Sequence, residues 1–318
     1  MKKLHQLPLW LIAATMLFTA CDKDDTNHYF MGRTSTPTPI ETDPRQSEAP
    51  AEAKSNLEFP AVKGGNSIVL IHRAQLNSSY YGLNYAVEWD TDKHAQRWSC
   101  YKLFENTYNG SSGDATVSRY NPSNNETLTP TSQYPNDPVL PTEYQFTVDP
   151  YKGSGFDHGH ICPSADRQKS ADANYQTFFL TNMQPQNNGF NAGIWSDMED
   201  QVRKWTASFD TLYVCKGGTI DNESYINRYL GSGANKIPVP KYFFMAVLGK
   251  KGNDFKAIAF WIDQDNHPAT SPKSYATNIK TLENNTGIDF FCNLPDNIET
   301  EVENVSASQV QSDWTWLK

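Results

Sequence analysis

The sequence has no excess of positive charge: 27 Lys and Arg stand against 36 Asp and Glu, which gives a formal net charge of −9. This balance disfavours a protein that coats nucleic acid with bulk positive charge, although it leaves room for a local basic site. No short repeat dominates the 318 residues, which excludes a collagen-like or coiled-coil chain. Aromatic residues make up 13% of the chain, which argues against disorder and favours one large globular domain or two ordinary ones.

Long apolar runs are also missing. The run over residues 7–18 is about 12 residues long, well short of the roughly 20 that span a bilayer as a helix. Lys2 and Lys3 precede this run and small residues follow it, which predicts a secretory signal peptide over residues 1–20. Residues 18–21 resemble a lipobox, in which the cysteine becomes the lipidated first residue of the mature protein, so we expect Cys21 to carry a lipid anchor.

The lipobox implies a protein exported and lipid-anchored to the outer membrane of a Gram-negative bacterium. The acidic run over residues 22–25 resembles an export signal to the cell surface, and it equally suits the solvated start of a linker. Residues 21–60 are rich in proline and polar residues and cannot bury enough apolar surface to offset their chain entropy. We expect the lipidated cysteine and a disordered tether over 21–60, followed by one domain over 61–318.

The domain alternates strand and helix signals. Strands are expected over residues 84–89, 97–103, 177–180, 212–215, 242–248 and 257–262. Helices are expected over about 192–208 and 274–284, and long loops over 104–145. This pattern predicts an α+β fold, with helices and long loops around one sheet.

Cysteines are few and widely spaced. Beyond Cys21 the chain has Cys100, Cys162, Cys215 and Cys292, whose spacing resembles no zinc motif. An exported protein could join them in two disulfides, with three possible pairings. Buried free thiols are the equally good alternative, because Cys100 and Cys215 both lie in expected strands.

The densest polar cluster spans residues 155–167. It contains Asp157, His158 and His160 in a chain that has only seven histidines. Alternate residues of a strand share a face, so the two histidines could bind zinc together. Acid–base catalysis and a structural hydrogen-bond network are the other two interpretations of this cluster.

A second cluster runs from residue 180 into the expected helix. Asn191 stands where that helix should begin, and an ordinary N-cap would explain it. Glu199 lies two turns further on, where a solvated helix face would explain it.

Together the two clusters resemble the DNA/RNA non-specific endonuclease family, whose members have a ββα-metal (His-Me finger) active site. The family signature is Asp-Arg-Gly-His, followed by an Asn at a helix start and a Glu eight residues later. Asp157, Gly159 and His160 match this signature, Asn191 follows His160 by 31 residues, and Glu199 follows Asn191 by eight. His158 replaces the family arginine. The resemblance extends from about residue 98 to 295.

The resemblance implies a central, mostly antiparallel sheet carrying a ββα-metal motif. It also implies an Mg²⁺-dependent endonuclease, with Mn²⁺ as a substitute, that hydrolyses DNA and RNA to 5′-phosphate products without strong sequence preference. His160 would be the general base and Asn191 the direct metal ligand. Glu199 would hold the metal through water, and Asp157 would organise the site.

Phosphate contacts are expected from basic residues. The family uses an upstream arginine to stabilise the reacting phosphate, and Arg119 is our candidate. Arg203 and Arg167 are further candidates, although Arg203 could instead form a salt bridge with Glu199 and Arg167 a surface ion pair. His158 either does a milder version of the family arginine's work or only packs.

Two other functions fit parts of the sequence. The 16 Tyr, 16 Phe and 8 Trp would suit a surface lipoprotein that binds glycans. A zinc hydrolase could use His158 and His160, although no third ligand stands at local spacing. The oligomeric state is open.

Overall fold

The computed structural model describes residues 49–108, 116–123 and 131–316. The expected signal peptide, Cys21 and most of the expected tether lie outside the described residues. None of the helices in these ranges is both long and apolar enough to cross a membrane.

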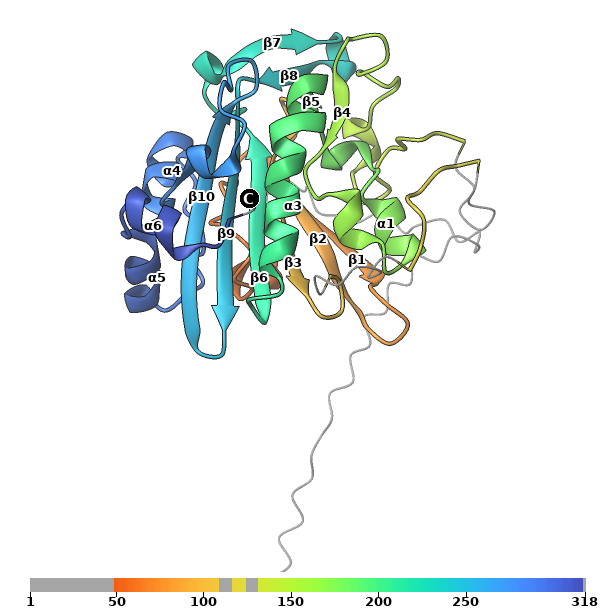
Figure 1. Cartoon of the computed structure of the whole chain (residues 1–318). Helices are drawn as coiled ribbons and strands as arrows, with labels where there is room; N and C mark the ends of the chain where they lie inside the picture. Colours follow the sequence, from red (N-terminus) through yellow and green to blue (C-terminus); the bar gives the residue numbers. More distant parts are fainter. Residues whose placement is uncertain (1–48, 109–115, 124–130, 317–318) are drawn as a thin grey trace, which may run out of the picture. The chain divides into compact units, whose positions relative to one another are not determined.

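A seven-stranded sheet organises the domain (Figure 1). Its strand order is β1-β2-β3-β6-β9-β10-β11, and each neighbouring pair is antiparallel. The strands are β1 (Ser67–Gln75), β2 (Tyr81–Asp90), β3 (Ala95–Phe104), β6 (Thr211–Gly218), β9 (Tyr242–Lys251), β10 (Asp254–Asp263) and β11 (Ala276–Thr277). Two small sheets pair β4 (Asp157–His160) with β5 (Met183–Gln186), and β7 (Ile226–Leu230) with β8 (Ile237–Pro240). The α+β prediction is therefore confirmed.

Short helices connect and cover these strands. The α-helices are α1 (Ala171–Gln176), α2 (Asn188–Phe190), α3 (Ser196–Trp205), α4 (Ile279–Thr286), α5 (Asp296–Glu303) and α6 (Ala307–Asp313). A π-helical turn, Asn191–Trp195, joins α2 to α3. Ser170, Asn278 and Ser306 cap α1, α4 and α6 by accepting backbone N–H bonds, which satisfies donors that a helix start leaves free. Gly287 ends α4 with a φ of 71°, a conformation that glycine adopts without strain.

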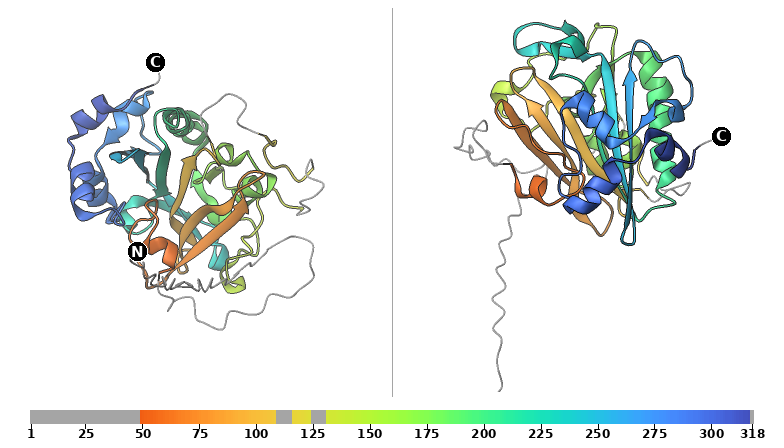
Figure 2. Two further views of the ribbon diagram at one scale, coloured as in Figure 1. Left: turned by 90° about the horizontal axis from the view of Figure 1, so that it is seen from below. Right: turned by 90° about the vertical axis from the view of Figure 1, so that its left-hand side faces the viewer.

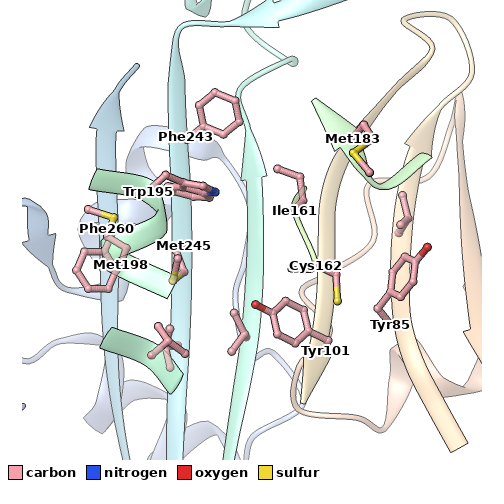
Figure 3. Close-up of a cluster of buried hydrophobic side chains, with 14 of the residues drawn as sticks. Tyr85, Tyr101, Ile161, Cys162, Met183, Trp195, Met198, Phe243, Met245 and Phe260 are labelled. Atoms are coloured by element: carbon pink, nitrogen blue, oxygen red, sulfur yellow. The ribbon is translucent and has the colours of Figure 1, made fainter. Parts of the chain in front are cut away.

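The sheet is buried on both faces because its strands alternate between two cores. One core packs side chains of α3 and of the π-helical turn before it against the inward residues of β3, β6, β9 and β10, as Figure 3 shows for Trp195 and Met198 beside Met245 and Phe260. The other core packs α4 and α5 against the opposite face, with Leu282 and Phe244 among its members. In the left view of Figure 2, sheet strands lie between the blue C-terminal segment and the green segment that carries α1 and α3. Burial of each large apolar side chain contributes about 1.5–3 kcal/mol before the chain entropy is subtracted.

Three expected elements differ from the structure. The strand expected over residues 177–180 is wrong: a turn follows α1, and a 3₁₀-helix, Leu180–Asn182, comes next. The side-chain amide of Asn182 donates to the carbonyl of Thr177 and holds this turn against the strand propensity of the aromatic residues between them. The helix expected over 274–284 is α4, which starts only after Asn278. The helix expected over about 192–208 begins earlier, as the series α2, π-turn and α3.

The packed domain begins before residue 61, so the expected tether is too long at its C-terminal end. Ala51–Lys54 forms a 3₁₀-helix, and Phe59 is fully buried with its ring edge against Trp98. The side-chain amide of Asn293 donates to the carbonyls of Ala53 and Asn56. These contacts attach residues 51–60 to the domain, and the proline-rich composition of the surrounding segment conceals them.

The four cysteines of the described residues are unpaired thiols. Cys100 and Cys215 are direct cross-strand partners on β3 and β6, and both are fully buried. Burial raises the pKa of both thiols well above the ordinary value. The structure therefore agrees with the buried free thiols that were one of the two expectations.

Candidate active site

The antiparallel pair β4–β5 places the two histidines. Residue by residue, Asp157 faces Gln186, His158 faces Pro185 and His160 faces Met183. Gly159 lies between the histidines, and a Cβ at this position would overlap the side chain of Gln186, which is fully buried. A glycine is therefore needed for β4 and β5 to approach closely.

A cleft of about 490 Å³ opens beside β4 and collects residues that are far apart in the sequence. Its lining residues are Arg119, Tyr134, Phe156, Asp157, His158, His160, Pro163, Ser164, Ala165, Asn191, Ser196, Glu199 and Arg203. Seven of the eight side chains predicted for the chemistry thus meet in one place, and Arg167 does not.

Asp157 orients the amide of Asn191. Its Oδ2 accepts hydrogen bonds of 2.9 Å from Nδ2 of Asn191 and from Nδ2 of Asn188. Asn191 has helical backbone angles and its side chain accepts no bond from a first-turn N–H, so the N-cap interpretation of this residue is wrong. With Nδ2 committed to the carboxylate, the carbonyl oxygen Oδ1 remains to accept from, or bind to, a group in the cleft.

Glu199 points into the cleft rather than lying on a solvated helix face. Its Oε1 accepts a hydrogen bond of 2.5 Å from Nζ of Lys216, whose side chain is completely buried. Lys216 also lies 4.7 Å from the ring centroid of Trp195. Burial raises the pKa of Glu199, and Lys216 and Arg203 oppose that rise. The other carboxylate oxygen, Oε2, accepts no hydrogen bond from the described residues.

His160 is held as a neutral imidazole. Burial lowers its pKa well below the ordinary value, and the positive charge of Arg119 lowers it further. Its Nε2 is buried and has no hydrogen-bond partner among the described residues. An imidazolium would have to donate from both ring nitrogens, so an unpaired Nε2 also disfavours the charged form. The edge of the ring packs on Phe178, 4.8 Å between centroids.

His158 is a packed residue. Its ring is stacked between Tyr134 and Tyr151, at centroid distances of 3.7 and 4.4 Å, and its Nε2 lies 3.0 Å from a carboxylate oxygen of Asp149. Of the two roles expected for His158, the structure favours packing over phosphate contact. A zinc site is also disfavoured, because in the described ranges no convergent set of three His, Cys, Asp or Glu ligands includes His158 or His160.

The three arginines differ in the groups that their guanidinium contacts. Arg119 is exposed at the cleft, stacks on Phe178 at 4.7 Å and makes no ion pair with a described carboxylate. Arg203 lines the cleft but pairs with Asp166 at 2.8 Å and also with Asp200, so the expected bridge to Glu199 is not formed. Arg119 therefore has the guanidinium that is most available to an anion.

Arg167 is buried and does not reach the cleft. Its guanidinium donates to the backbone carbonyls of Asn84, Lys102 and Asp166. Both expectations for this residue, a phosphate contact and a surface ion pair, are wrong, because these carbonyls occupy the guanidinium within the core.

Sequence reasoning missed Lys216, Tyr134 and Asp149. Lys216 had a signal: it continues the inward alternation of Leu212 and Val214 along β6, which is unusual for a charged residue. Tyr134 and Asp149 lie in long loops without periodicity, and no local pattern connects them to the histidines.

The alternative of glycan binding lacks a platform of exposed tryptophans. The exposed large hydrophobic side chains of the described ranges are Tyr80, Tyr81, Val139 and Val148.

Comparison with known proteins identifies the family. Residues 74–297 match the family described as DNA/RNA non-specific endonuclease, and the chain belongs to this family. It is 34% identical over 178 residues to a nuclease from Nostoc sp., covering 52% of this chain and 62% of the relative. It is 36% identical over 104 residues to the mitochondrial endonuclease G of Homo sapiens, covering 31% and 35%.

The chain spans a little over half the length of the first two relatives, 62% and 55%. A solved structure, that of EndoG in its complex with EndoGI, superposes with a TM-score of 0.58 at 20% identity. The match covers 78% of this chain and 95% of the solved one, and it supports the fold alone.

Proposed function

We propose that the chain is a divalent-metal-dependent endonuclease that hydrolyses phosphodiester bonds in both DNA and RNA. One observation carries the proposal: a single cleft joins a neutral histidine, an oriented amide oxygen, a partly buried carboxylate and an arginine that makes no ion pair with a described carboxylate. Family membership supports it, since the family is defined by non-specific cleavage of DNA and RNA.

The donor set of the cleft fits a hard divalent ion. Asn191 Oδ1 and the free oxygen of Glu199 are oxygen donors, which Mg²⁺ and Mn²⁺ prefer, whereas zinc sites favour nitrogen and sulfur. Asn191 would hold the ion directly and Glu199 would hold it through water. When bound, Mg²⁺ would supply Lewis-acid stabilisation of the charge on the phosphate and the leaving oxygen.

The side chains of the cleft divide the remaining work. His160 accepts a proton from the attacking water, which the neutral ring can do at physiological pH. Arg119 neutralises the phosphate oxygens, and Asp157 keeps the Asn191 amide in one orientation. Lys216 favours the ionised form of Glu199 and fixes its position. The family resemblance implies cleavage that leaves a 5′-phosphate.

Weak sequence preference follows from the kind of contact proposed. Contacts to phosphate and sugar position a strand without reading its bases. The net charge of −9 limits binding by bulk electrostatics, so we expect binding and turnover to depend on the divalent ion more steeply than on salt.

A plasmid-nicking and RNA-degradation assay on residues 22–318 tests the function. We expect nicking of DNA and degradation of RNA with Mg²⁺ or Mn²⁺, and loss of both in EDTA. His160→Ala should reduce turnover by at least about 10²-fold while the circular dichroism spectrum is retained. Intact substrates with either ion, or substantial turnover in the folded His160→Ala protein, would refute the proposal.

We also propose that Cys21 is lipidated and anchors the protein in the outer membrane. Support comes from the charged start, the short apolar run and the lipobox-like residues 18–21. Labelled palmitate should enter the full chain but not Cys21→Ser, and only the former should fractionate with outer membranes. Equal labelling of the two would refute the anchor.

A further inference from the structure

Three carboxylates converge on the side of the sheet opposite to the active-site cleft. Glu283 belongs to α4, Asp289 to the loop that follows it, and Glu303 to the end of α5. One carboxylate oxygen from each residue lies within 4.8 Å of those of the other two. Both helices pack in the core on the face of the sheet away from α3, so this acidic triad belongs to no part of the active site.

The Glu303 carboxylate has no hydrogen-bond donor among the described residues, and only the charge of Lys280 partly opposes its own. Its side chain is 7% exposed, Oε1 is closed to solvent, and neither oxygen accepts a hydrogen bond from the described residues. Burying an unpaired carboxylate is costly unless a positive charge or donors approach it. The pKa of Glu303 is raised to about 7 by burial and by the neighbouring acids Glu283, Glu299 and Asp289.

The other two members of the triad are already fixed in position. Glu283 Oε1 accepts from the backbone N–H of Phe290 at 3.1 Å, and its Oε2 accepts from Nζ of Lys280 at 3.0 Å. Asp289 is exposed, so one side of the triad is open to ions from solution. Glu299 adds a fourth negative charge nearby, and Lys280 opposes these acids with one positive charge. The net charge of this group is therefore negative, and Glu303 is the member whose carboxylate has no hydrogen-bond donor among the described residues.

We propose that Glu283, Asp289 and Glu303 form a calcium-binding site that joins α4 to α5. Carboxylate oxygens are the ligands that Ca²⁺ takes, at about 2.3–2.6 Å, and two oxygens on opposite sides of one ion are then about 5 Å apart. Three oxygens within 4.8 Å of one another lie within about 2.8 Å of a common centre, so small side-chain movements bring all three to Ca²⁺ bonding distance. Mg²⁺ needs bonds of about 2.1 Å and gives up its water reluctantly, so it is the poorer fit.

Calcium binding at this position stabilises the fold and leaves catalysis unchanged. Leu282 of α4 and Val302 of α5 both pack in the same core. An ion that joins the two helices therefore holds both of them against that core. The sheet separates the triad from the cleft. A ligand that binds only the folded protein raises the midpoint of thermal unfolding, and the rise grows with ligand concentration.

Thermal unfolding of the EDTA-treated protein with added CaCl₂ tests the proposal. The variants are Glu303→Gln and Asp289→Asn, with Glu301→Gln as a matched control, because Glu301 is an exposed residue of the same helix. We expect Ca²⁺ to raise the unfolding midpoint of the parent and of Glu301→Gln by several degrees. The two triad variants should show a much smaller rise. In EDTA, Glu303→Gln should be at least as stable as the parent, because the amide removes the unpaired charge.

Calorimetric titration with Ca²⁺ gives a second readout, since the active-site cleft also has oxygen donors. The parent should bind one more Ca²⁺ than Asp289→Asn, whose exposed side chain can change without disturbing the fold. Equal midpoint rises and equal Ca²⁺ stoichiometry in the parent and both triad variants would overturn the proposal. Mg²⁺-dependent nicking by all the variants should match the parent, so the outcome is separate from that of the proposed nuclease function.

Discussion

The Nδ2 amide of Asn191 donates a 2.9 Å hydrogen bond to Oδ2 of Asp157, which connects the turn before α3 to the first residue of β4. An asparagine amide can otherwise rotate and present either its oxygen or its nitrogen to a ligand. The bond selects the oxygen. In the proposed function, Asp157 would therefore act on a bound ion through Asn191, in the way that outer-shell partners orient metal ligands.

Removing this partner should weaken metal binding more than it weakens the fold. We expect Asp157→Ala to raise the Mg²⁺ concentration needed for half-maximal nicking by about 10- to 100-fold. Asp157→Asn retains an acceptor oxygen and should restore most of that loss. A Mg²⁺ titration of each variant is the measurement, and identical titrations of Asp157→Ala and the parent would show that Asn191 is oriented by other contacts.

The charge of Arg119 should be visible in the pH dependence of activity. A base must be neutral, and the pKa of His160 is lowered by burial and then by Arg119. Activity should therefore persist below pH 6.5, where a solvent-exposed histidine would already be protonated. In Arg119→Met the pKa of His160 rises, and the acidic limb of log(kcat/KM) should move to higher pH.

Arg119→Met should also lose about 10²- to 10³-fold in kcat/KM, because one charge that stabilises the phosphate is gone. Arg119→Lys keeps the positive charge and is the control, with an acidic limb close to that of the parent. An unmoved limb in Arg119→Met would mean that Arg119 does not act on His160, even if the rate falls.

The ion pair between Lys216 and Glu199 should support both stability and activity. Lys216→Met leaves a mostly buried carboxylate without its partner, and breaking such a pair lowers the free energy of unfolding by about 3 kcal/mol. The pKa of Glu199 is already raised, and losing Lys216 raises it further. The ionised form is then disfavoured in the folded state, so the stability of the variant should fall as pH rises above about 4.5.

Activity of Lys216→Met should recover in part at alkaline pH, where Glu199 ionises again. Urea unfolding at several pH values and a nicking profile against pH measure the two effects. Lys204→Met removes the same charge from an exposed position on α3 and is the control. Equal unfolding free energies for the two variants would contradict the assignment.

Spacing along the chain predicted the residues of the cleft but not their partners. Asp157, His160, Asn191 and Glu199 were predicted because the family signature fixes their order and separation. Lys216 enters the site because β6 lies between β3 and β9, and this strand order is a long-range property that no local pattern contains. The same holds for Tyr134, which lies in a long loop and stacks on His158 without any local pattern that connects the two.

Local propensity failed where buried hydrogen bonds or packing opposed it. The aromatic residues before Leu180 favour a strand, yet the bond from Asn182 to the carbonyl of Thr177 imposes a turn there. Residues 51–60 have a linker composition, yet Phe59 completes the core beside Trp98. In each case a buried group that composition does not reveal decides the local structure.

Substitution of Gly159 tests the strand pairing that positions His160. A methyl group at this residue would overlap the buried side chain of Gln186, so Gly159→Ala must displace that side chain or push β4 away from β5. We expect a loss of about 1–3 kcal/mol in the free energy of unfolding, as in other overpacked cores, and a fall in nicking rate. Gly189→Ala is the matched control, because nothing lies within 4 Å of a Cβ built there, and its unfolding free energy should stay within about 0.5 kcal/mol of the parent. Urea unfolding measures both variants. A Gly159→Ala protein as stable and active as Gly189→Ala would show that β4 tolerates a wider approach, and that the glycine between the two histidines is not required by packing.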